Sequence, residues 1–195
     1  MVEPARRTER TNQKARTRSA IVAATRELVE SGGEVTMPGI AAAALVSEAT
    51  AYRYFPDLVT LLGEVLNRID PDAAMAEVAG SVDPVERVGH AADVLARHVV
   101  RRQGAVRALI AATIVRPGSK ARPGNRFPLI QQALTPWSET ADPEKVELLT
   151  RDLAVVISAE ALFTLVDLYG LPAEEAVASL VRTARNLTAA AIMAS

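Results

Sequence analysis

Residues 36–55, TMPGIAAAALVSEATAYRYF, constrain the fold most strongly, because they predict two short helices joined by a tight turn. Thr36 fits the N-cap of the first helix, and Pro38 fits its first turn. Ser47 fits the N-cap of the second helix, which is expected over about residues 48–54. Two short helices connected in this way form a helix-turn-helix unit, whose second helix can enter the major groove of DNA.

The second helix ends in the sequence TAYRYFPD, residues 50–57, and an apolar helix pattern follows it. Ile40-Ala41 lies upstream, and Val46-Ser47 stands at the turn. Together these residues resemble the tetracycline-repressor (TetR) family of bacterial regulators, over about residues 17–66. The resemblance implies an all-helical homodimer, in which a small N-terminal DNA-binding domain precedes a larger domain that binds an effector.

The rest of the chain also predicts an all-α fold. Apolar residues recur at helical spacing along the long segments, and these segments contain little Gly or Pro. Further helices are expected at about residues 14–31, 58–69, 72–79, 84–103, 105–115, 128–134, 143–169 and 173–193. The segment 116–126 has two Pro-Gly pairs and four positive charges, which predict a mobile loop.

The sequence divides into three parts. Residues 1–15 read as a disordered basic arm, residues 16–70 as the helix-turn-helix DNA-binding domain, and residues 71–195 as a larger effector-binding and dimerisation domain. The boundary rests on Asp70-Pro71-Asp72, which interrupts the apolar pattern. The first twenty residues contain six Lys or Arg and two Glu, so the arm either reaches DNA phosphates or the minor groove, or is a solvated tail.

The composition argues against several classes of protein. The chain has no cysteine, which excludes disulfides and thiolate metal sites and fits a reducing cytoplasm. Its two histidines have no matched carboxylate cluster, and no phosphate-cradling glycine loop or nucleophile motif is present. No apolar run reaches the roughly 18 residues that span a bilayer. We therefore expect a cytoplasmic protein that is not an enzyme, has no membrane partner and uses no metal or cofactor.

The candidates for contacting DNA cap the two short helices or lie on the exposed face of the second one. They are Thr36, Ser47, Glu48, Ala49, Thr50, Tyr52, Arg53 and Tyr54. Arg53 could pair with guanine or bind a phosphate, and otherwise it is an ordinary exposed arginine; Thr50 could touch a base or a thymine methyl group. The TetR resemblance implies that Tyr52 contacts a phosphate through its hydroxyl and that Thr36 combines capping with a phosphate contact. Without that role, Tyr52 would be a packing aromatic.

Two positions depart from the TetR pattern. The glycine that the family usually has in the turn is Leu45 here, and a left-handed backbone at a residue with a β-carbon costs roughly 1–2 kcal/mol. The turn is therefore either reshaped or strained. A lysine that opens the next helix and touches a phosphate in the family is Leu58 here. Because each neutralised phosphate adds about −0.9 to the salt slope, we expect weaker non-specific DNA binding than in a typical member unless the basic arm compensates.

The last two helices and a set of polar and aromatic residues carry the expectations for the larger domain. The helix expected at 143–169 has two apolar stripes, so one face can pack on its own body while the other meets a partner. An intramolecular bundle would give the same pattern, and the resemblance favours a homodimer through the last two helices. Glu160 and Asp167 lie seven residues apart, and they either recognise a ligand or form rim or inter-subunit ion pairs. The candidates for contacting an effector are His98, Arg107, Phe127, Trp137, Glu160, Phe163 and Asp167.

These observations predict a DNA-binding transcriptional regulator whose partners are double-stranded DNA and an unknown small molecule. From the resemblance, we expect a dimeric repressor that binds a pseudo-palindromic operator and is released by the effector. The alternative is a helical interaction protein that has lost specific DNA binding, which Leu45 and Leu58 favour. Thr50, Tyr52 and Arg53 favour the DNA-binding interpretation.

Overall fold

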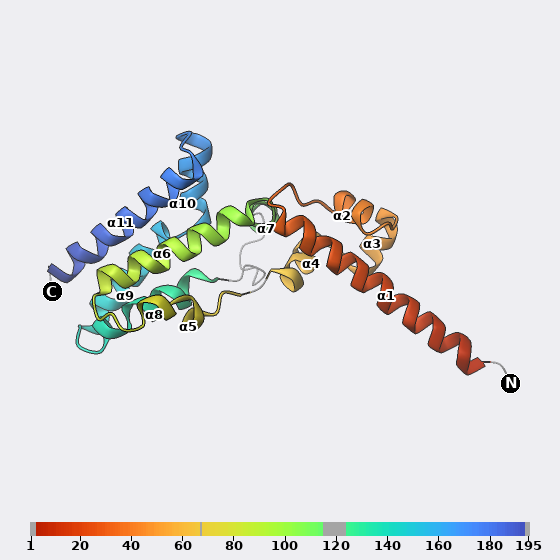
Figure 1. Cartoon of the computed structure of the whole chain (residues 1–195), viewed down its shortest axis with the longest axis horizontal. Helices are drawn as coiled ribbons and strands as arrows, with labels where there is room; N and C mark the ends of the chain where they lie inside the picture. The colour runs from red at the N-terminus through yellow and green to blue at the C-terminus, as the bar shows by residue number, and fades with distance from the viewer. Residues whose placement is uncertain (1–2, 67, 115–123, 194–195) are drawn as a thin grey trace. The chain divides into compact units, whose positions relative to one another are not determined.

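The computed structural model describes residues 3–66, 68–114 and 124–193, with side chains described from Asn12 onward. These residues form helices and no strand, so the expected all-α class is confirmed for them (Figure 1). The predicted loop at 116–126 lies largely outside the described residues. The helices are α1 Glu3–Glu30, α2 Met37–Ala43, α3 Glu48–Tyr54, α4 Leu58–Val65, α5 Pro71–Ala74, η1 Ala76–Val78, α6 Pro84–Arg101, α7 Gln103–Ile114, α8 Arg126–Ser138, α9 Pro143–Val156, α10 Ala159–Phe163, η2 Thr164–Leu168 and α11 Ala173–Met193.

The chain forms two compact units. The N-terminal unit comprises Met1–Asn67 and Arg101–Pro123, and the C-terminal unit comprises Arg68–Val100 and Gly124–Ser195. The first crossing between them lies close to the boundary expected near residue 70. In contrast to the expected division, however, α7 belongs to the N-terminal unit.

Buried apolar side chains explain why α7 joins the N-terminal unit. Ala105 and Leu109 of α7 are buried in one core with Ile21 of α1, Ile40 of α2 and Leu61 of α4. Burying a side chain the size of leucine or isoleucine stabilises a fold by about 1.5–3 kcal/mol. The core thus holds α7 against α4, with which it is in direct contact. The apolar periodicity of α7 predicts a buried face, but it does not show which unit this face packs against.

The approach of α7 to the segment after α1 depends on Gly104. A β-carbon added to Gly104 would lie 1.6 Å from the carbonyl oxygen of Gly33, so only glycine fits at position 104. Nearby, the Arg102 guanidinium lies 2.6 Å from a carboxylate oxygen of Glu30. These contacts fix the start of α7 beside the end of α1.

The first helix is longer than the sequence pattern predicts. α1 begins at Glu3, whereas a helix was expected only from about residue 14, after a disordered arm. Residues 3–13 contain three Arg, two Glu, one Ala and one Gln, which have high intrinsic helix propensity and extend the helix without an apolar stripe. Apolar periodicity alone cannot detect a helical segment of this kind.

In the C-terminal unit, α9 packs against both α8 and α11. Arg97 of α6 contacts Asp93 one turn earlier and Glu174 of α11, with each pair at 2.9 Å, so α6 lies beside the start of α11. The hydrogen bonds that Arg97 donates, first to Asp93 and then to Glu174, raise the pKa of Arg97 above its ordinary value. Arg97 thus connects α6 to α11 through Glu174.

A buried arginine supports a proline inside α8. Arg87 of α6 is buried and donates hydrogen bonds to the carbonyl oxygens of Gln132 at 2.7 Å and Ala133 at 3.0 Å. Pro136 lies four residues after Gln132 within α8 and has no N–H to donate to that carbonyl. Arg87 supplies the missing donor, and it also bonds the carbonyl oxygens of Val78 and Ser81.

The helix expected at 143–169 is wrong as a single element. α9 ends at Val156, and α10 and the π-helical turn η2 follow it. The break occurs because Ser158 adopts an extended backbone and caps α10, its Oγ accepting a hydrogen bond from the Ala161 N–H at 3.0 Å. The apolar pattern continues across this break, since Ile157 is fully buried.

The final helix is confirmed as α11, whereas α4 ends at Val65 rather than near residue 69. In the described part of the chain, no helix is both long and apolar enough to cross a membrane.

Candidate nucleic-acid interface

The cap of α2 is formed by Thr36. Its backbone is extended, and its Oγ1 accepts a hydrogen bond from the Gly39 N–H at 3.2 Å. Ile40 and Ala41 point into the core and anchor the helix. The predicted cap is confirmed, and it leaves Thr36 half-buried at the edge of the helix-turn-helix.

The turn between α2 and α3 takes the left-handed backbone that the sequence raised as one possibility. Leu45 has a φ of 55°. The N–H of Leu45 donates to the Ala42 carbonyl at 3.1 Å and that of Val46 to the Ala41 carbonyl at 2.9 Å, which is the Schellman pattern of a helix end. The side chain of Leu45 is 93% exposed, so it gains nothing from burial. The turn is therefore not reshaped, and the fold tolerates the strain.

The start of α3 is organised by Ser47 and Thr50. Ser47 Oγ accepts a hydrogen bond from the Thr50 N–H at 3.2 Å and lies 2.9 Å from Thr50 Oγ1, to which it can donate. Both hydroxyls are thus tied into the cap. Ala51 and Phe55 are buried, as predicted, and they set the angle at which α3 presents its other residues.

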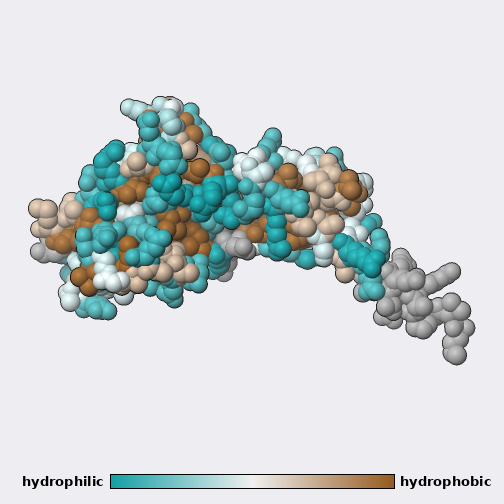
Figure 2. All heavy atoms as spheres, in the orientation of Figure 1, coloured by the Kyte–Doolittle hydropathy of each residue, from teal (hydrophilic) through white to brown (hydrophobic). Residues whose placement is uncertain are grey.

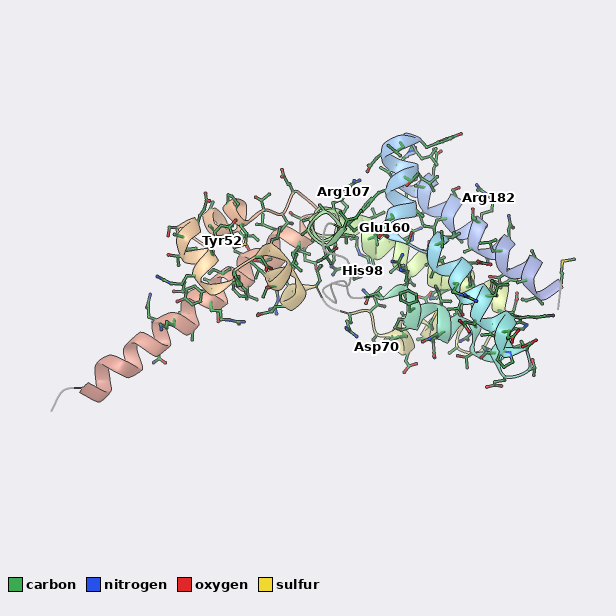
Figure 3. The ribbon with its side chains drawn as sticks, turned by 180° about the vertical axis from the view of Figure 1, so that it is seen from behind. Tyr52, Asp70, His98, Arg107, Glu160 and Arg182 are labelled. Carbon is green, nitrogen blue, oxygen red and sulfur yellow. The ribbon has the colours of Figure 1, made fainter. Side chains whose placement is uncertain are left out.

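The other face of α3 is open. Ser47, Glu48, Ala49, Tyr52 and Arg53 are exposed, and Thr50 and Tyr54 are half-buried. Tyr52 is 47% exposed, which argues against a purely packing role for this ring (Figure 3). The guanidinium carbon of Arg53 lies 5.6 Å from the centroid of the Tyr54 ring. The predicted DNA-contacting residues of α3 are therefore presented together.

A polar cleft separates α3 from α1. It has a volume of about 580 Å³ and is lined by Gln13, Lys14, Thr17, Val46, Ser47, Thr50, Arg53 and Tyr54. The sequence analysis did not include Gln13 or Thr17 among the candidates, and it placed Lys14 among the cations of the basic N-terminal segment, where the first helix was expected to begin. Nothing in the pattern of α1 shows which of its faces lies beside α3, since that depends on tertiary packing.

Arg18 ties α1 to the elements after α3. It forms an ion pair with Glu64 of α4, and its guanidinium carbon lies 5.0 Å from the centroid of the Phe55 ring. The cation–π contact and the ion pair both act on a side chain that is about half exposed, so each is worth about 1 kcal/mol or less. Arg18 is thereby engaged within the domain, whereas Lys14 lines the cleft one turn earlier.

Leu58, which replaces the lysine of the TetR pattern, belongs to an apolar surface. It packs against the N-terminal core and lines a groove of about 750 Å³ with residues of the α1–α2 segment and of α7, among them Arg107. The beginning of α4 thus presents an apolar side chain where the family has a cation. Among the effector candidates, Arg107 belongs to this N-terminal unit (Figure 3).

The other six effector candidates lie in the C-terminal unit. Two of them meet at Arg126: its Nη1 is 3.6 Å from a carboxylate oxygen of Glu160, and its guanidinium carbon is 5.6 Å from the centroid of the Phe127 ring. Arg126 Nη1 also donates to the Ala154 carbonyl at 3.2 Å. Glu160 therefore has an ion-pair partner within its own chain, and its contact with an effector stays a prediction. His98, Trp137 and Phe163 are half-buried on α6, α8 and α10, and Asp167 is exposed on η2.

Comparisons with known proteins agree with this geometry. A family model described as bacterial regulatory proteins, tetR family, matches residues 20–65, which contain α2, α3 and α4. A crystal structure of a tetR-family transcriptional regulator from Streptomyces coelicolor is similar in fold, with a TM-score of 0.60 and 20% sequence identity over 92% of this chain and 83% of that chain. No curated protein matches the chain. Residues 20–65 are thus similar to the DNA-binding part of the tetR family, which supports a role as a DNA-binding transcriptional regulator.

Proposed function

We propose that this protein is a transcriptional repressor, which binds a pseudo-palindromic operator as a homodimer and leaves it when a small molecule binds. The observation that carries the proposal is the open face of α3, where Tyr52 and Arg53 are exposed above the buried Ala51 and Phe55. An exposed helix held in this way in a helix-turn-helix can enter the major groove. In a dimer, two such helices would lie about 34–36 Å apart, or a multiple of that distance.

Exposed apolar side chains on the last helices support the dimer. Leu148 and Val155 lie seven residues apart on α9, and Val155 is 73% exposed. Met193, at the end of α11, is also exposed. On the surface of the C-terminal unit, apolar side chains lie among hydrophilic ones (Figure 2). Because α9 and α11 already pack against each other, two copies of this pair would form a four-helix interface.

Effector release is proposed to act through the C-terminal unit. The candidate residues there are His98, Phe127, Trp137, Glu160, Phe163 and Asp167, whereas Arg107 lines the groove in the N-terminal unit. A ligand changes DNA affinity only if it binds the DNA-competent and released states with different affinity. In this scheme the effector favours a state in which the two recognition helices lose their spacing.

The test is selection of binders from a random duplex pool by the full-length protein and by Tyr52→Phe, which removes only the hydroxyl. Tyr169→Phe is the matched control, because Tyr169 is an exposed tyrosine outside the helix-turn-helix, 77% accessible. We expect the wild type and the Tyr169 variant to enrich the same pseudo-palindrome, and the Tyr52 variant to bind it roughly tenfold more weakly, as for loss of one hydrogen bond to a charged group. Equal binding by all three proteins would contradict the phosphate contact of Tyr52.

A second candidate function is that of an interaction protein that has lost specific DNA binding. The 93% exposed Leu45 in the turn and the apolar Leu58 at the start of α4 favour it, since both lie at the surface that would face DNA. The same selection distinguishes the two functions. Absence of any enriched sequence at low salt would favour the interaction protein.

A further inference from the structure

The cleft between α1 and α3 has the chemistry of an anion site. Two cationic side chains line it from opposite sides, Lys14 from α1 and Arg53 from α3. Its other lining residues are polar or apolar, and none of them is a carboxylate. The volume of about 580 Å³ is ample for a phosphodiester group with its first water molecules.

The neutral polar groups of the cleft are partly committed to the protein. Ser47 Oγ and Thr50 Oγ1 are in contact at 2.9 Å, and the Thr50 N–H is bonded to Ser47 Oγ. These groups stabilise the α3 side of the cleft but carry no charge. Attraction for an anion therefore comes chiefly from Lys14 and Arg53.

The placement of Arg53 bears on its role. Its guanidinium lies over the Tyr54 ring, and both side chains line the cleft on its α3 side. Stacking on an aromatic face leaves the edges of the guanidinium available for hydrogen bonds in the plane. Arg53 is thus directed to the part of α3 that adjoins α1.

We propose that Lys14 and Arg53 form a clamp for one phosphate of the DNA backbone, so that Arg53 positions the recognition helix and does not read a base. This inference rests on the proposed function in taking DNA as the ligand. The DNA backbone is favoured over a free phosphate because the cleft is continuous with the exposed face of α3: Ser47, Thr50, Arg53 and Tyr54 belong to both. Backbone contacts fix register and orientation, whereas contacts to base edges carry sequence information.

The experiment measures the affinity of the full-length protein for a random-sequence duplex as a function of KCl concentration. The variants are Lys14→Gln, Arg53→Gln and the double variant. Arg26→Gln and Arg68→Gln are the controls, because each removes an exposed cation that does not line the cleft and lies outside the basic N-terminal segment. Circular dichroism checks that helical content is unchanged.

The slope of log K against log[KCl] is the deciding quantity. If both side chains neutralise the same phosphate, the magnitude of the slope should fall by about 0.9 per protomer in the double variant. It should fall by less in each single variant. The controls should keep the wild-type slope. Affinity at low salt should fall roughly tenfold in the double variant, as expected for one charge-assisted hydrogen bond. A loss near 1.8 per protomer would mean two separate phosphates and would overturn the shared clamp, as would an unchanged slope.

Sequence selection separates this inference from the proposed function. Arg53→Gln should enrich the same operator as the wild type with lower overall affinity. Loss of preference at one base pair would show that Arg53 reads a base, and the clamp would be wrong.

A wild type that binds random duplex but enriches no operator would contradict the repressor, and the salt slopes would then decide whether the clamp exists. Failure of the wild type to bind any duplex at low salt would overturn both. Saturable binding of inorganic phosphate to the wild type, together with equal salt slopes for DNA binding by the wild type and the double variant, would overturn the choice of the DNA backbone as the ligand.

Discussion

Leu45 shows, at the scale of a single residue, how a turn keeps its geometry with an unfavourable side chain. The Schellman hydrogen bonds of Leu45 and Val46 require the left-handed backbone, and the φ of 55° is observed although a β-carbon is present. We predict that Leu45→Gly raises the free energy of unfolding by about 0.5–1 kcal/mol. The relief of roughly 1–2 kcal/mol of strain exceeds the entropy that glycine adds to the unfolded chain.

Denaturant unfolding measures this effect. Leu45→Ala is the matched control, because it removes the exposed side chain and keeps the β-carbon; it should lie within about 0.5 kcal/mol of the wild type. Equal stability of the glycine and alanine variants would show that the strain is negligible.

Arg87 and Pro136 are predicted to be coupled. Arg87→Met should lower the free energy of unfolding by about 2–4 kcal/mol, because buried carbonyl oxygens on α8 and in the segment before α6 lose their donor. Pro136→Ala restores an N–H that can reach the Gln132 carbonyl. In that background the cost of Arg87→Met should be smaller by roughly 0.5–1.5 kcal/mol. A double-mutant cycle with additive effects would contradict this role of Arg87.

At the scale of elements, the junction of α7 with the segment after α1 makes the sharpest prediction. Gly104→Ala should destabilise the protein by at least about 2 kcal/mol, because its β-carbon would lie 1.6 Å from the Gly33 carbonyl oxygen and the backbone would have to move. Gly63→Ala is the matched control: it lies in α4, and an added β-carbon would meet no atom within 4 Å. That variant should gain about 0.5–1 kcal/mol. Similar unfolding midpoints for the two variants would contradict the close approach.

The elements also show what could be predicted from the sequence and why. The caps at Thr36 and Ser47 are local, since each side chain accepts a hydrogen bond from the N–H three residues later, and both caps were predicted. The break at Ser158 was missed because Ile157 keeps the apolar period across it. The assignment of α7 to the N-terminal unit and the face of α1 that carries Lys14 depend on tertiary packing. The open face of α3 could therefore be predicted, whereas the cleft beside it could not.

At the scale of the whole molecule, the proposed homodimer makes a prediction about the surface that would join two copies of the chain. Val155 is 73% exposed on α9, one heptad from the exposed Leu148, and an isologous interface would bury both residues twice. We predict that Val155→Glu converts a dimer into monomers in sedimentation experiments, because it places two buried charges at the two-fold interface. Val82→Glu is the matched control: Val82 is 79% exposed but precedes α6 and lies outside the last helices, so this variant should remain dimeric.

The same pair of variants links assembly to DNA binding. A monomer loses the simultaneous engagement of two half-sites, so Val155→Glu should bind a selected operator at least about 100-fold more weakly than the wild type, while Val82→Glu binds it normally. The residual binding of the monomer should show roughly half of the wild-type salt slope, because each protomer neutralises its own set of phosphates. A monomeric wild type, or a Val155 variant that stays dimeric, would mean that the apolar stripes of α9 serve only packing within one chain. If the wild type is monomeric, the two recognition helices have no fixed spacing, and a pseudo-palindromic operator is not expected.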